Sequence, residues 1–78
     1  MVYALWDTVT INLVASFDNR QDALSLVLSG IERNGPRDTD TLALEAEDEN
    51  GNITSIAQGK ELAELARKEL SSLGRLVG

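Results

Sequence analysis

The chain has 78 residues, of which 13 are acidic and 7 basic, and it contains neither cysteine nor histidine. A chain of this length predicts a single domain over residues 1–78 with a small core. The missing residue types exclude disulfides, thiolate metal sites and histidine acid–base chemistry. The net charge of −6, with the basic residues spread along the sequence, disfavours nucleic-acid binding.

A pair of strand-forming segments opens the sequence, at residues 2–7 and 13–17. Apolar residues alternate along the second segment, which is typical of a strand with one buried face. Residues 8–12 must supply the turn between the strands. Asn12 is expected to take a positive φ there, because the turn contains no glycine.

A helix follows, with Asp18 as its predicted N-cap and Gln21 three residues later, the spacing of a capping box. Asn-Gly-Pro at 34–36 ends it, and residues 37–40 form a short polar connector. One apolar stripe at helical spacing predicts its buried face: Ala23, Leu24, Val27, Leu28 and Ile31.

The next pattern is a second hairpin. Residues 41–47 alternate as in a half-buried strand, and 52–57 return as its partner. Asn-Gly at 50–51 predicts a two-residue type I′ turn, which needs a positive φ at both positions. Ile53 and Ile56 have opposite parity, so a bulge or an early strand end is expected between them.

A second helix is predicted from about residue 60 to 73, ended by Gly74 and followed by a tail at 75–78. Its apolar stripe consists of Leu62, Leu65, Ala66, Leu70 and Leu73.

Residues 40–74 can be superposed on residues 1–35 with a gap-free offset that puts Leu44 on Leu5. The hypothesis is a ββα-ββα pseudo-repeat, although any two strand–strand–helix units would align roughly this well. The predicted class is α+β. We expect a two-layer sandwich with a four-stranded antiparallel sheet and both helices on one face.

Such an architecture leaves one sheet face without a cover. If Leu5 and Leu44 face the helices, Trp6 should point to the open face; the alternative is that a bulge returns it to the core. An exposed apolar patch would mark a possible interface, and its expected members are Ala4, Trp6, Val14 and Ala43.

The acidic segment 45–52 could be read as a calcium loop, with Asp48 and Asn50 at two ligand positions. Ala46 and Ala57 then occupy the first and twelfth positions, where carboxylates are needed, so a charged hairpin tip is the better interpretation. No other pattern predicts a metal site, a cofactor or catalytic residues, and we expect no enzyme.

The segments Tyr3-Ala4-Leu5-Trp6-Asp7 and Asn12-Leu13-Val14, with Asp18 before Ala23-Leu24, resemble small bacterial strand–strand–helix domains of unknown function. That resemblance implies a fold and pairing through the sheet. The first half is also similar to HicB-type antitoxins, although it lacks their extra strand and a basic DNA-binding appendage.

The hypothesis from the sequence is therefore a cytoplasmic protein-interaction module that forms a homodimer by covering the open sheet face. The alternative is an antitoxin-like or inhibitor protein that binds a basic partner protein. No segment has the length and apolar character of a membrane span or the pattern of a secretory signal.

Overall fold

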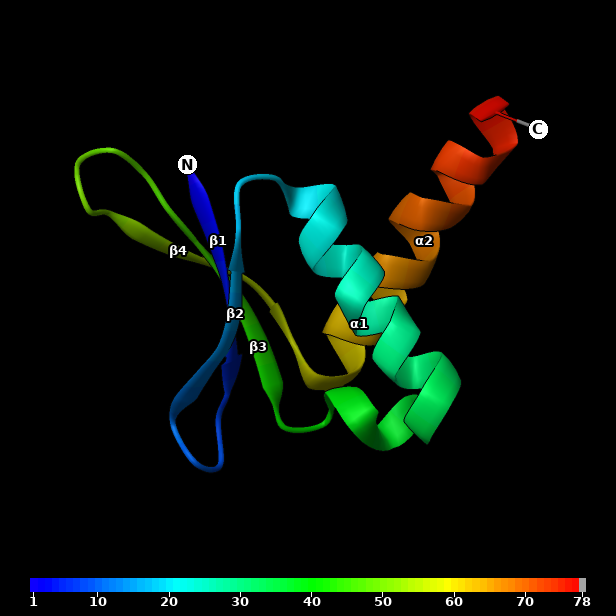
Figure 1. Ribbon diagram of the computed structural model, residues 1–78, viewed down its shortest axis with the longest axis horizontal. Helices are drawn as coiled ribbons and strands as arrows, with labels where there is room; N and C mark the ends of the chain where they lie inside the picture. Colours follow the sequence, from blue (N-terminus) through cyan, green and yellow to red (C-terminus); the bar gives the residue numbers. More distant parts are fainter. Residues whose placement is uncertain (78) are drawn as a thin grey trace.

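The computed structural model describes the backbone of residues 1–77 and the side chains of residues 1–35 and 37–70. Strand–strand–helix occurs twice along the chain, and a short 3-10 helix joins the two halves (Figure 1). The elements are β1 (Val2–Asp7), β2 (Asn12–Phe17), α1 (Arg20–Asn34), η1 (Pro36–Thr39), β3 (Leu42–Glu47), β4 (Ile53–Gln58) and α2 (Gly59–Val77). The predicted α+β class is confirmed.

The four strands form one antiparallel sheet in the order β2-β1-β3-β4. Both helices lie on the same side of this sheet (Figure 1). The first strand of each hairpin is thus central, and the second strand of each is an edge. The antiparallel sheet with both helices on one side is confirmed, and the strand order is a finding that the sequence did not predict.

The core lies between the sheet and the helices, and its centre is the pair Leu5 and Leu44, which stand opposite each other on β1 and β3. Both leucines are almost fully buried. α1 and α2 cover them with the apolar stripes read from the sequence; the side chain of Leu73 lies outside the described residues. The other buried members of this cluster are Ala23, Leu24, Val27, Ile31, Ala57, Leu62, Ala63 and Ala66.

Each hairpin contains one bulge beside the paired leucines. The register of β1 with β2 shifts after Leu5, which leaves Val14 as the extra residue of β2. The register of β3 with β4 shifts after Leu44, which leaves Ile56 as the extra residue of β4. The bulge expected between Ile53 and Ile56 is therefore confirmed, whereas the one at Val14 was not predicted.

The α1 helix begins one residue later than expected. Asn19, and not Asp18, is the N-cap: its Oδ1 accepts a hydrogen bond of 2.8 Å from the backbone N–H of Asp22, and its Nδ2 donates to the Asp22 carboxylate at 3.0 Å. Asn19 and Asp22 have the spacing predicted for Asp18 and Gln21, one position further on, but the return bond comes from the Asn19 side chain and not from its backbone N–H, so only half of a capping box is formed. At the other end, Gly35 has a φ of 94° and its N–H bonds to the carbonyl of Ile31, as predicted.

The turns of both hairpins differ from the predictions. Ile11, and not Asn12, takes the positive φ, at 57°. In the second hairpin only Gly51 has a positive φ, so the connection is not a type I′ turn. The N–H of Gly51 bonds to the carbonyl of Asp48, and the N–H of Asp48 to the carbonyl of Asn52, which is the three-residue loop with a glycine bulge.

Two connections carry more structure than the sequence indicates. The stretch expected to be a polar connector forms η1, with Thr39 fully buried. α2 runs to Val77, past the predicted stop at Gly74, so the backbone of 75–77 is helical and not a tail; residue 78 lies outside the described residues. The two helices are tied by an ion pair of 2.6 Å between Arg20 and Glu69.

The order of elements repeats, but the pseudo-repeat stays a hypothesis. The hairpin loops within the two halves differ in geometry, and the ungapped offset does not hold through the second strand of each half, where Phe17 ends β2 and Gln58 ends β4.

Candidate functional site

The side of the sheet away from the helices, here called the open face, is covered by neither α1 nor α2 (Figure 1). Because β1 and β3 pair without a register shift, side chains alternate strictly between the two sides along both strands. Leu5 and Leu44 face the helices, so their neighbours face outward. Across the strands these residues form rows: Leu13–Trp6–Ala43–Gln58, then Ser16–Ala4–Glu45–Ser55, then Val2–Glu47–Ile53.

Trp6 lies on this open face. It is half-buried, it pairs with Ala43 on β3 and Leu13 on β2, and it is not among the residues packed against the core. The alternative in which a bulge returns Trp6 to the core does not hold, because the bulge belongs to β2 and leaves the alternation of β1 intact. An indole ring in the middle of an uncovered sheet can supply much of the contact area of an interface.

Three of the four residues expected in the patch share this face, and one does not. Ala4, Trp6 and Ala43 lie in adjacent rows. Val14 is the bulged residue and lines a hollow together with Leu26 of α1, on the helix side of the sheet. Leu13, which the sequence analysis missed, takes the place beside Trp6. The opposite roles of two adjacent apolar residues can be assigned only once the bulge is known.

The charges of the molecule are segregated by layer. All seven basic residues belong to helices: Arg20 and Arg33 of α1, Arg37 of η1, and Lys60, Arg67, Lys68 and Arg75 of α2. The sheet and its hairpin loops carry carboxylates only: Asp7, Glu45, Glu47, Asp48 and Glu49. Residues that are scattered in sequence are thus sorted in space, and the open face combines an aromatic and aliphatic surface with negative charge.

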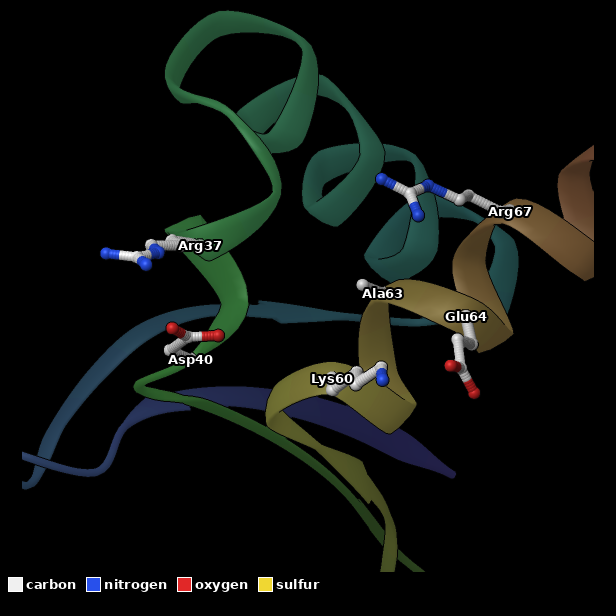
Figure 2. A pocket seen from close by; sticks show the side chains of 6 residues that line it. All are labelled: Arg37, Asp40, Lys60, Ala63, Glu64 and Arg67. Carbon is white, nitrogen blue, oxygen red and sulfur yellow. The ribbon is translucent and has the colours of Figure 1, made fainter.

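The hollow between η1 and α2 is the other candidate site (Figure 2). It has a volume of about 320 Å³ and is lined by Arg37, Asp40, Lys60, Ala63, Glu64 and Arg67. Figure 2 shows the Arg37 side chain extending to the side away from α2, so the basic groups do not converge on one point. Two carboxylates line the same space, and the lining contains no hydroxyl or thiol group. The hollow therefore has the character of a mixed-charge surface groove and offers no catalytic arrangement.

The carboxylate of Asp48 accepts hydrogen bonds that stabilise the turn at the acidic hairpin tip. Asp48 Oδ1 accepts hydrogen bonds of 2.9 Å from the backbone N–H groups of Asn50 and Asn52, and Oδ2 accepts one of 3.2 Å from the Asn52 side chain. The bond from the Asn52 backbone, aided by the other two, lowers the pKa of Asp48. Among the described residues no three potential metal-ligating side chains come together.

Comparison with known protein families, curated proteins and solved structures finds no significant match to this chain. The likenesses drawn from the sequence, to small strand–strand–helix domains and to HicB-type antitoxins, stay hypotheses. Within the part of the chain that the structure describes, neither helix combines the length and the apolar character needed to cross a membrane.

Proposed function

We propose that this protein is a non-catalytic protein-interaction module that self-associates through its sheet. One observation carries the proposal: of the eight large apolar side chains that are exposed among the described residues, seven belong to the sheet layer or directly adjoin it. They are Met1, Val2, Val9, Ile11, Leu13, Val14 and Ile53. The helical layer contributes only Leu26.

Exposed apolar residues concentrated in one layer support binding through that layer, because burying them against another protein is favourable. A small domain also has little core of its own, so association adds apolar burial that the monomer cannot supply. The hollow between η1 and α2 does not compete with this proposal, since its polar groups do not converge as those of an active site do.

The test is the solution mass of the full chain by multi-angle light scattering over a wide concentration range. A dimer that dissociates on dilution is the expected result. A monomer at every concentration would contradict self-association.

The second candidate function is the capture of a basic partner protein on the open face. The segregation of charge favours it, because Glu45 lies one row and Glu47 two rows from Trp6 on the open face, and the sheet carries no basic residue. Such binding would be weakened by salt. The probe is an amphipathic peptide of alternating lysine and leucine, followed by the fluorescence of Trp6, the one tryptophan of the chain. Glu45→Lys should weaken the binding, and Glu49→Lys, at the hairpin tip, is the matched control.

A further inference from the structure

The exposed apolar side chains are unevenly distributed over the molecule. Five of the eight lie in β2, in the loop before it or on the neighbouring flank of α1, and Met1 and Val2 lie at the start of β1. The exposed fractions of these five are large: Val9 71%, Ile11 79%, Leu13 50%, Val14 51% and Leu26 42%. The second hairpin has Ile53 alone. The edge of the sheet at β2 is thus the most apolar uncovered region of the described chain.

β2 is an edge strand in which the bulge at Val14 is the one feature that usually protects such a strand. Its sequence, Asn-Leu-Val-Ala-Ser-Phe, contains neither a charged residue nor proline. Natural edge strands normally carry a lysine, an inward-pointing charge, a proline or a bulge to prevent pairing with another chain, and of these β2 has only the bulge. The unpaired backbone groups of β2 are therefore open to a second strand, and no like charges oppose two copies of β2 that meet.

The flank of α1 next to β2 is self-complementary. Leu26, Ser29 and Arg33 line the hollow that Val14 also lines, and Asp22, four residues before Leu26, continues the same side of the helix. Asp22 and Arg33 are 11 residues apart, which is about 16 Å along the helix. Across a two-fold axis between two antiparallel copies of α1, Asp22 of each copy comes opposite Arg33 of the other.

The open face offers no such pairing. Two copies packed face to face would bring together Glu45 and Glu47 of both, with no basic residue on either sheet. Like charges opposed at an interface are costly. We infer, on the basis of the proposed self-association, that the partner at the β2 edge is a second copy of the chain. The two copies pair β2 with β2 in antiparallel fashion and α1 with α1, so that one eight-stranded sheet runs through a two-fold dimer.

The test is a charge-reversal series read out by light scattering and sedimentation velocity. Asp22→Arg and Arg33→Asp each place like charges opposite each other twice per dimer, so each should weaken dimerisation by at least about tenfold. The double variant exchanges the two charges and restores both pairs across the axis, so it should recover dimerisation. A role of these residues within one copy would not produce such a recovery.

Two further variants separate this surface from the open face. Val14→Lys puts a charge at the edge and should abolish the dimer, and far-UV circular dichroism checks that the fold is kept. Trp6→Glu, on the open face, should leave the mass unchanged. A dimer that withstands both single reversals and Val14→Lys but dissociates with Trp6→Glu would overturn the inference and leave the proposed self-association intact. If the wild-type protein is a monomer at every concentration, both the proposed self-association and the inferred dimer at β2 are wrong.

Discussion

The two hairpins share the arrangement of their strands and bulges, but the residues at the tips of their loops differ. Each contributes a central strand with a buried leucine, and each has a bulge in its edge strand beside that leucine. In each, an aspartate at or just after the end of the first strand accepts hydrogen bonds from backbone N–H groups of the loop: Asp7 from Val9 and Thr10, and Asp48 from Asn50 and Asn52.

The difference lies in what occupies the tips. The second tip has asparagine and glycine with the positive φ at Gly51, which costs no steric strain. The first tip has Val9 and Ile11 exposed, and a β-branched residue in the left-handed region. A tip that is both strained and apolar is not explained by the folding of the hairpin. Backbone strain and exposed apolar residues that folding does not require are typical of positions that serve function. Val9 and Ile11 lie in the loop directly before β2, the edge strand at which we infer the dimer contact.

The largest effect should come from the leucines that the hairpins share. Leu5→Ala and Leu44→Ala should each lower the free energy of unfolding by about 2–5 kcal/mol, because each leaves a cavity in the centre of the core. Urea denaturation measures both. Leu13→Ala, at a half-exposed position, is the control and should change it by about 0.5 kcal/mol or less. Unequal costs for the two buried leucines would show that the halves are not energetically equivalent.

The next largest effect comes from placing glycine at the first hairpin tip and removing it from the second. Ile11→Gly should raise the free energy of unfolding by up to about 1 kcal/mol, since it removes left-handed strain and adds only the entropic cost of glycine. Gly51→Ala should lower it by about 1–2 kcal/mol; no atom is near enough to clash with the added methyl group, so only the backbone responds. Thermal unfolding of both variants measures these changes. A loss of stability in Ile11→Gly would contradict the claim that the backbone of Ile11 is strained.

The smallest effect is the pH dependence of the second tip. The pKa of Asp48 is lowered in the folded protein, so the stability that its carboxylate adds is complete above its unfolded pKa of about 3.9. It is lost as the pH falls through the folded pKa. We expect the amide proton shifts of Asn50 and Asn52 to titrate together below the usual range for aspartate. In Asp48→Asn these shifts should no longer titrate in that range.

Sequence patterns predict most of this fold because burial dictates it. Alternation identifies Leu42 and Leu44 as inward, and helical spacing identifies Ala23, Leu24 and Val27. The turns are predicted less well, since the choice of Ile11 over Asn12 depends on the register that the whole sheet imposes. The predicted apolar patch on the open face is wrong at Val14 for a related reason: one extra residue in β2 changes the side of the sheet on which the neighbouring side chains lie. The separation of charge between layers follows from the element to which each basic residue belongs, together with the placement of both helices on one side of the sheet.

The strand order also has a consequence during synthesis. β1 is made before its second neighbour exists, because Asp7 pairs with Leu42 and Val2 with Glu47, 35 and 45 residues later in the chain. Until β3 has left the ribosome, the uncharged segment 2–6 has one edge open and no helix α2 to cover it. Strand pairing over such a sequence distance is slow compared with the formation of hairpins and helices. During that interval the unpaired edge of β1 is of the kind that favours aggregation of incompletely folded chains.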